Sequence, residues 1–245
     1  TTQISYENTY HTFPQTVTPP IAAQTESYTF DAGTGNLRTI TDVNGQTTSY
    51  DYDTFGRLIK TVKPGDSFNF PTIQYQYNNW GTLNQQHLKI LTKVADGDYL
   101  WQSRYFDGLG RIIQTHARGE TGRTIIDSTI TYDNRSLVER EYVPQDLDTS
   151  QVSGYKAPDS GWKYSTYVYD GLARVSSVTA ADGTVTGTDY SVPWQTTVTD
   201  PRGYKHKYCY DAFGHLTRVD ELGNPSDPND KTSLYATTTY AYDTL

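Results

Sequence analysis

The sequence predicts an all-β protein made of successive antiparallel β-hairpins. Three observations favour this fold: a repeated Tyr-Asp motif, turn dipeptides between its copies, and 22 tyrosines with no methionine among 245 residues. Tyrosine and threonine are typical of strands. No window of 11 or more residues repeats its apolar side chains with a period of 3.6, so essentially no helix is expected.

The motif is clearest in YDYDTFGRL, residues 50–58. Four copies share an aromatic residue, an aspartate, a small residue three places later, then a basic and a branched apolar residue. The copies are Tyr52, Asp53, Gly56, Arg57 and Leu58; Phe106, Asp107, Gly110, Arg111 and Ile112; Tyr169, Asp170, Ala173, Arg174 and Val175; and Tyr210, Asp211, Gly214, His215 and Leu216. Each copy also has a bulky apolar residue two places after the aspartate: Phe55, Leu109, Leu172 and Phe213.

Weaker copies lie at Asp31, Asn78, Asp133 and Asp243. The spacing between copies is irregular, which fits hairpins of varying length better than the fixed blade of a propeller. The motif therefore predicts a strand, a turn and the start of the next strand.

Each motif position has a structural explanation. The aspartate can accept backbone N–H groups of the turn, as in an Asx-turn. The glycine permits the positive φ that reverses the chain, and the arginine can reach an acidic neighbour or lie over an aromatic ring. We expect the repeated residues to be structural.

Other turns are marked by dipeptides. Asn44-Gly45, Asp96-Gly97 and Asp182-Gly183 predict hairpins with tight primed turns, and Pro201 with Gly203 predicts a type I turn. Loops are expected at 64–71, 143–162 and 221–233, which are rich in Pro, Gly, Asp and Ser.

Apolar residues occur at both strand parities after the motif turn, as in Leu58 with Ile59 and Ile112 with Ile113. A sandwich would alternate more cleanly between apolar and polar residues. The pattern favours a single long sheet that is exposed to solvent on both faces and is held together by cross-strand tyrosine and threonine pairs.

Several functions are disfavoured by composition. The net charge of −8 argues against nucleic acid as a partner, and the single Cys209 excludes an intramolecular disulfide. No apolar run reaches the length of a membrane-spanning helix. His206, Cys209 and His215 suggest a metal site, but His206 and Cys209 would point to opposite faces of a strand. We expect no metal, cofactor or catalytic residues.

These residues resemble the RHS or YD-repeat family, which includes polymorphic toxins, components of insecticidal toxin complexes and the teneurins. The resemblance runs from about Tyr6 to Asp243 and is specific in YDTFGRLIKTVKPGDS, YFDGLGRIIQTHARGE and YVYDGLARVSSVTAADGT. It implies a β-sheet that spirals into a hollow shell, which in toxin members encloses a C-terminal effector. Complete family shells contain a self-cleavage site near a DPxG segment. We assign this site to no residue here, because Asp200-Pro201-Arg202-Gly203 is an internal repeat turn and residues 226–230 lack the sequence that surrounds the site in the family.

We therefore predict a non-enzymatic scaffold, with residues 1–245 as one RHS/YD-repeat region. The missing initiator methionine and the broken motif in the terminal YAYDTL predict an excerpt of a longer, secreted or cell-surface shell whose targeting signals lie outside this chain. Expected partners are further repeats of the same polypeptide, neighbouring copies and an enclosed effector domain.

Two alternatives remain open. The chain could be a cell-surface module that binds carbohydrate or protein through exposed tyrosines and the four tryptophans, Trp80, Trp101, Trp162 and Trp194. Exposure of these tryptophans at a rim would favour binding, and burial would favour a scaffold. An enzyme would require a cleft with two close carboxylates of perturbed pKa.

Overall fold

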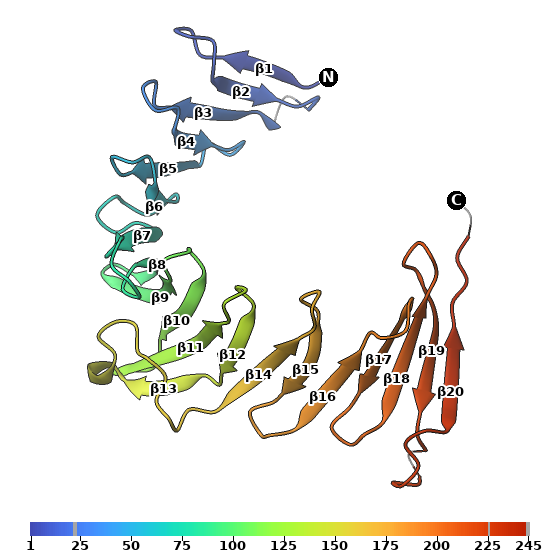
Figure 1. Ribbon diagram of the computed structural model, residues 1–245. Coiled ribbons are helices and arrows are strands. Elements are labelled where there is room, and N and C mark those ends of the chain that lie inside the picture. Colours follow the sequence, from blue (N-terminus) through green and yellow to red (C-terminus); the bar gives the residue numbers. More distant parts are fainter. Residues whose placement is uncertain (22–23, 225, 244–245) are drawn as a thin grey trace. The chain divides into compact units, whose positions relative to one another are not determined.

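The protein is antiparallel β-structure almost throughout, which confirms the predicted fold class (Figure 1). The computed structural model describes residues 1–21, 24–224 and 226–243. Pro225 of the predicted loop 221–233 and the last two residues of YAYDTL lie outside the described residues. Within the described residues, the longest helical segment is the 3₁₀ turn η2 (Thr149–Gln151).

The chain forms two compact units, of which unit 1 comprises residues 1–126 and 146–156. Ten of its strands follow one another along the chain, and each pairs antiparallel with the next. They are β1 (Gln3–Tyr6), β2 (Pro14–Thr18), β3 (Glu26–Phe30), β4 (Leu37–Thr41), β5 (Thr47–Tyr52), β6 (Leu58–Val62), β7 (Ile73–Asn78), β8 (His87–Ala95), β9 (Asp98–Phe106) and β10 (Ile112–Arg118).

Unit 2 comprises residues 127–145 and 157–245. Here β12 pairs with β14, and consecutive strands pair antiparallel from β14 to β20. The strands are β12 (Val138–Tyr142), β14 (Tyr164–Tyr169), β15 (Val175–Thr179), β16 (Val185–Asp189), β17 (Gln195–Thr199), β18 (Lys205–Tyr210), β19 (Leu216–Leu222) and β20 (Leu234–Thr239). Along the chain, β11 (Arg123–Tyr132) and β13 (Gln145–Asp148) pass from one unit to the other. That residues 1–245 form one RHS/YD-repeat region stays a prediction.

Turns fall alternately on the two edges of each sheet because neighbouring strands run antiparallel. We call the edge that carries the motif turns the motif rim, and the opposite edge the far rim. In unit 2 the β14–β15, β16–β17 and β18–β19 turns lie together at the upper edge in Figure 1, and the β15–β16 and β17–β18 turns at the lower edge. In unit 1 the motif rim carries the β3–β4, β5–β6, β7–β8 and β9–β10 turns.

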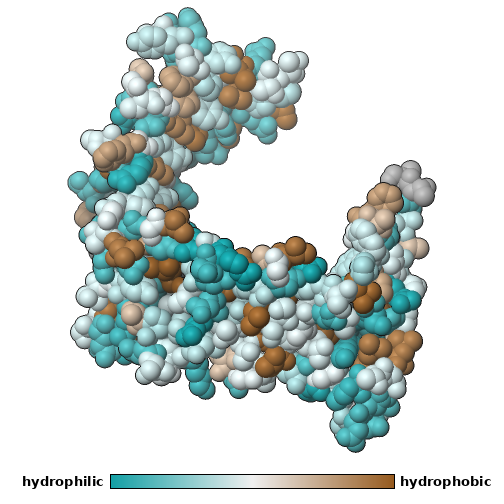
Figure 2. Space-filling model, viewed as in Figure 1, coloured by the Kyte–Doolittle hydropathy of each residue, from teal (hydrophilic) through white to brown (hydrophobic). Residues whose placement is uncertain are grey.

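Both faces of the sheets are largely open to solvent, as predicted. Most strand positions of β3–β5 and β15–β18 are half-exposed on both faces, and Figure 2 shows hydrophobic residues as separate spots among polar ones. Threonine pairs join neighbouring strands, with 2.6 Å between the hydroxyls of Thr29 and Thr39 and 2.9 Å between those of Thr41 and Thr47. Such cross-strand pairs stabilise a sheet that lacks a deep core.

Burial is concentrated at β9–β11 of unit 1, where Tyr105, Ile113 and Ile126 are buried. Residues 149–156, which we call the strap, cross this region and belong to the same unit. The predicted loop 143–162 is therefore partly ordered: it contains β13 and η2, and Trp162 near its end packs edge-on against Tyr142 of unit 2, with ring centres 6.4 Å apart.

A β-bulge follows every strict motif turn. In the first copy Asp51 pairs with Lys60 and Tyr52 with Leu58, so Ile59 has no partner across the hairpin. Two residues then face one, and the alternation of the strand between its faces is interrupted. This bulge explains why the sequence places apolar residues at both parities after the turn. The residues at the bulge in the other strict copies are Ile113, Ser176 and Thr217.

The predicted primed turns are wrong. A type I′ turn needs positive φ at both central residues, but at Asn44-Gly45 only the glycine is positive, at +73°. Gly45 N donates to Asp42 O at 3.0 Å, and Asp42 Oδ1 accepts the Asn44 and Gln46 amides, which gives a type I turn followed by a left-handed glycine. Asp96 and Asp182 likewise lack positive φ. At Asn44-Gly45 the Asp42 carboxylate stabilises an unprimed turn that the dipeptide alone does not reveal.

Ala173 is expected to be strained. Its φ is +62°, close to the +77°, +80° and +83° of Gly56, Gly110 and Gly214 at the same motif position. A Cβ in this region costs roughly 1–2 kcal/mol. Ala173→Gly should therefore raise the free energy of unfolding by about 0.5–1 kcal/mol, measured by urea denaturation, after the greater freedom of glycine in the unfolded chain is subtracted.

The matched control is Ala181→Gly, in the β15–β16 turn, where φ is not positive. This change gains nothing in the folded state and should destabilise the protein slightly. Equal losses of stability in both variants would contradict the assignment of strain to Ala173.

Candidate functional site: the motif turn and its neighbours

Each motif aspartate closes its own turn, as Asp107 illustrates. Asp107 Oδ1 accepts the Leu109 amide at 2.9 Å and the Arg111 amide at 3.0 Å, while Oδ2 accepts Arg111 Nε at 2.7 Å. The backbone adds hydrogen bonds from Asp107 N to Arg111 O and from Gly110 N to Asp107 O. Both carboxylate oxygens are thus occupied inside the turn.

The other copies repeat this geometry. Asp53, Asp170 and Asp211 each accept the amides two and four residues later at 2.9 Å. Nε of Arg57 and Arg174 lies 2.7 Å from the carboxylate of its own motif, and His215 Nδ1 replaces the guanidinium at 3.0 Å from Asp211 Oδ2. The remaining motif residues pair across the hairpin, namely Tyr52 with Leu58, Phe106 with Ile112, Tyr169 with Val175 and Tyr210 with Leu216.

These hydrogen bonds keep the motif carboxyls ionised. The Arg174 amide is the main cause that lowers the pKa of Asp170. Burial alone would raise the pKa values of Asp53 and Asp107, but the hydrogen bonds from the amides and guanidinium of the turn outweigh it, and both pKa values fall.

The basic motif residue also reaches the next hairpin along the chain. The guanidinium carbon of Arg57 lies 4.2 Å from the ring centre of Tyr77, which stands just before Asn78 of the next copy. The guanidinium of Arg174 lies 4.1 Å from the Tyr190 ring. In the weaker copy at Asp133 the arginine stands two places after the aspartate, and the guanidinium of Arg135 lies 6.0 Å from the Tyr169 ring. Where histidine replaces arginine, His215 stacks on Tyr242, with ring centres 4.8 Å apart.

These contacts join neighbouring hairpins through cation–π and stacking interactions. The sequence contains the signal in the strict copies, where a basic residue stands four places after the aspartate and an aromatic residue stands directly before it. The contact itself depends on the pairing of strands in space.

The carboxylates show no sign of acid–base chemistry. Every Asp and Glu with a shifted pKa among the described residues is shifted downward; Asp31 is lowered to about 2, chiefly by Arg38. A general acid working near neutral pH needs a raised pKa. These groups act as hydrogen-bond acceptors that stay charged.

Acidic residues line a hollow in each unit. One of about 360 Å³ in unit 1 is lined by Tyr10, Phe13, Tyr28 and Phe30, and its acidic residue, Glu7, already accepts amides of its own loop. The other, of about 190 Å³ in unit 2, contains Asp200, which is occupied by the amides of its own turn. Within residues 1–21, 24–224 and 226–243, no cluster of three or more His, Cys, Asp or Glu could hold a metal ion.

The four tryptophans have different environments. Trp162 is buried, and Trp101 is half-buried with Lys89 Nζ 4.9 Å from its ring centre. Trp80 stacks on Phe106, with ring centres 5.9 Å apart, whereas Trp194 is exposed at the motif rim of unit 2. Burial of Trp162 favours the scaffold, whereas Trp80 and Trp194, which are 47% and 61% exposed, fit the criterion for binding.

Sequence reasoning missed a buried polar cluster beneath the strap. The Tyr105 ring lies between His87 and His116, with ring centres 4.7 Å apart on each side. His116 Nε2 lies 2.7 Å from Gln114 Oε1, which also accepts the Lys156 amide of the strap. Burial, followed by the charge of His87, lowers the pKa of His116 to about 4.

Comparison with known families identifies the repeats. Residues 30–67 match the family described as RHS Repeat, and residues 78–193 match a domain of unknown function, DUF6443. The chain therefore contains an RHS repeat and is similar to the RHS/YD-repeat family. No curated protein matches the sequence.

Solved structures share the fold of this RHS-repeat chain. A crystal structure of TcdB2-TccC3 matches with 20% identity and a TM-score of 0.79 over 99% of this chain and 15% of that chain. TcdB2-TccC3-Cdc42 matches with 17% identity, a TM-score of 0.82, and coverage of 99% and 17%. A mutant Tc holotoxin pore of Photorhabdus luminescens gives 18% identity, a TM-score of 0.79, and coverage of 99% and 17%. The chain thus spans 15% to 17% of the length of these proteins.

Removing a motif carboxylate is expected to destabilise the fold. Asp107→Ala leaves the Leu109 and Arg111 amides without their acceptor and should lower the free energy of unfolding by about 1–2 kcal/mol. Asp107→Asn retains an oxygen for those amides and should cost less. Urea denaturation measures both, and Asp127→Ala, an exposed strand position, controls for loss of charge. A larger loss in the Asn variant than in the Ala variant would contradict this role.

His116 predicts sensitivity to mild acid. Its folded pKa of about 4 lies below the ordinary 6.5, so its neutral form is favoured by folding. The associated stability is complete above pH 6.5 and is lost as pH falls toward 4, by at most about 3 kcal/mol. His116→Gln should flatten this part of the stability profile in urea titrations, while His11→Gln, an exposed control, should not. An unchanged profile in His116→Gln would show that other groups control the acid response.

Proposed function

We propose that this RHS-repeat chain is a non-enzymatic section of a shell wall that encloses or displays a C-terminal effector. The observation that carries the proposal is the use of the motif's polar groups. Each aspartate of the strict copies accepts amides of its own turn, and Arg57, Arg174 and His215 each contact an aromatic ring of the next hairpin. Such residues extend a sheet hairpin by hairpin.

The fold shared with part of TcdB2-TccC3 supports this role, because 99% of this chain superposes on 15% of that longer chain. We propose that further repeats of the same polypeptide continue the sheet. The partners would then be other repeats, neighbouring copies and an enclosed effector, with no nucleic acid among them. The corresponding location is secreted or at the cell surface.

The exposed strand edges also support continuation. Among the described strands, β1 pairs with β2 alone and β20 with β19 alone. An open edge presents unpaired N–H and C=O groups to other strands. No helix among the described residues is long and apolar enough to span a membrane.

The orientation of β20 allows a sharp test. The Tyr240 amide donates to Thr217 O, so the alternation of an antiparallel ladder turns the Thr238 amide inward and the Thr237 and Thr239 amides outward. In the natural full-length polypeptide, the two outward amides should exchange with solvent at least ~100-fold more slowly than in residues 1–245 alone.

The Thr238 and Tyr240 amides are the internal controls and should be protected in both samples. Thr239→Pro, which removes an outward donor, should weaken the protection of neighbouring outward amides in the full-length polypeptide. Rapid exchange of Thr237 and Thr239 in both samples would show that nothing continues the sheet at β20.

A further inference from the structure

The hollow of about 360 Å³ in unit 1 has the size of a small-molecule site, and four aromatic rings line it. Tyr10 and Phe13 come from the loop between β1 and β2, and Tyr28 and Phe30 come from β3. Phe13 stacks on Phe30, with ring centres 5.1 Å apart. A Cβ added at Gly35 would lie only 3.2 Å from Phe13 Cζ, so the glycine leaves room for this ring. Packing between two neighbouring hairpins therefore fixes the Phe13 and Phe30 rings.

The acidic group of the hollow is engaged within the protein. The two carboxylate oxygens of Glu7 accept the amides of residues 9, 10 and 12 through four contacts of 2.6–3.1 Å. A carboxylate has about four acceptor positions, so Glu7 offers a ligand its charge and little further hydrogen bonding. The Tyr28 hydroxyl likewise donates to Glu26 Oε2 at 2.5 Å, which leaves mainly its ring for a ligand.

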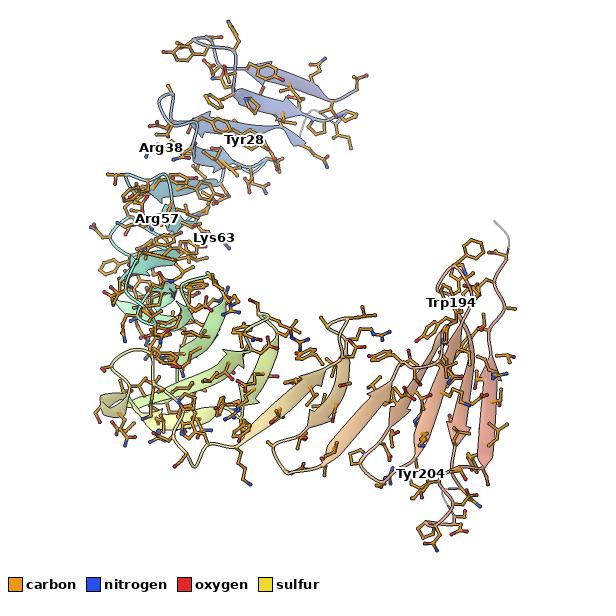
Figure 3. All side chains as sticks on the ribbon, viewed as in Figure 1. Tyr28, Arg38, Arg57, Lys63, Trp194 and Tyr204 are labelled. Atoms are coloured by element: carbon orange, nitrogen blue, oxygen red, sulfur yellow. The ribbon has the colours of Figure 1, made fainter. Side chains whose placement is uncertain are left out.

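The charge of the hollow is negative. The amide hydrogen bonds, that from Tyr10 foremost, lower the pKa of Glu7, so its carboxylate stays ionised. Among the described residues that line the hollow there is no Lys or Arg. Figure 3 labels Arg38 on β4, the strand beside Tyr28, and its Nη2 is already paired with Asp31 Oδ2 at 2.8 Å. The rings are therefore next to a negative charge that no basic lining residue balances.

A later hairpin shows what this hollow lacks. The Arg57 guanidinium lies 4.2 Å from the Tyr77 ring centre, so a cation of the chain itself covers that ring. In the opening hairpin, His11 stands four places after Glu7 but is not one of the residues that line the hollow. In the part of the chain that the structure describes, no Lys or Arg lies over the Phe30 ring. The hollow has the aromatic and acidic partners of a cation without the cation.

We propose that this hollow binds a quaternary ammonium group through the faces of its aromatic rings. Such a cation has no N–H donor, so it needs no free acceptor, and both the rings and the Glu7 charge attract it. A primary ammonium would need acceptors that Glu7 has already given to its own loop. A phosphate beside the cation would meet Glu7 with no basic lining residue to pair it. This ligand chemistry goes beyond the proposed scaffold role of the repeats.

An NMR titration of the 245-residue chain tests the proposal with choline as the probe. Choline should shift the amide signals of Tyr10, Phe13 and Phe30, with a dissociation constant on the order of 1 mM. Its uncharged tert-butyl isostere, 3,3-dimethylbutan-1-ol, tests the charge, and ethanolamine tests the quaternary centre. Both should bind at least ~5-fold more weakly than choline. Equal binding of either control would overturn the proposal.

Two further ligands separate the sources of such a group. Phosphocholine should bind more weakly than choline, because its phosphate meets the Glu7 carboxylate. A peptide that contains trimethyllysine carries the same cation without a phosphate. Tighter binding of the peptide than of choline would point to a modified protein as the source, and the reverse to a free small molecule. Tighter binding of phosphocholine than of either would contradict the assigned charge of the site.

Side-chain variants locate the binding to this hollow. Tyr10→Ser removes a ring that is 65% exposed but keeps the amide that Glu7 accepts, so it should weaken choline binding about 3-fold without loss of stability in urea. Tyr28→Phe keeps the ring and should leave the affinity unchanged. Tyr235→Ser, which removes a ring 58% exposed in unit 2, is the matched control.

Three results would overturn the assignment: no response to choline, an unchanged affinity in Tyr10→Ser, or an equal loss in Tyr235→Ser. None of them bears on the exchange experiment at β20, which tests continuation of the sheet in unit 2.

Discussion

The fold depends on one interaction: the motif carboxylate that accepts two amides of its own turn and the basic group four residues later. In Asp107 these contacts fix the turn, the left-handed Gly110 and the bulge at Ile113 together. The same contacts orient the basic group, and in the Asp53 copy the guanidinium then covers the Tyr77 ring. Hydrogen bonds inside a five-residue turn thereby hold the guanidinium in position to contact the next hairpin.

This linkage suits a protein with little core. Most strand positions are half-exposed, and burial is concentrated at β9–β11 of unit 1 and around Trp162 of unit 2. Where each hairpin contacts mainly its neighbours, stability is approximately a sum of nearest-neighbour terms. The buried cluster under the strap is the exception, and the lowered pKa of His116 makes that part of unit 1 sensitive to mild acid.

The sequence predicts the features that the repeated motif and the overall composition specify. The hairpins and the thinly covered sheet follow from the motif and from the threonine and tyrosine content. The turn type at Asn44-Gly45 was mispredicted because the decisive group is Asp42, which lies outside the dipeptide. The contact of Gln114 with Lys156 spans 42 residues, and no short-range pattern indicates it. The stacking of His87 and His116 on Tyr105 likewise depends on strand register.

The motif divides its positions between two tasks, and this division shows where function can reside. The aspartate, the left-handed residue and the basic residue are committed to the turn and the next ring, so changing them alters the fold first. The side chain two places after the aspartate is large, apolar and exposed in every strict copy, and in the Asp53 and Asp211 copies its ring also lies near the basic motif residue. Trp194 extends the series despite backbone strain. The motif rim is therefore the part of each unit where side chains can change with the least effect on the sheet.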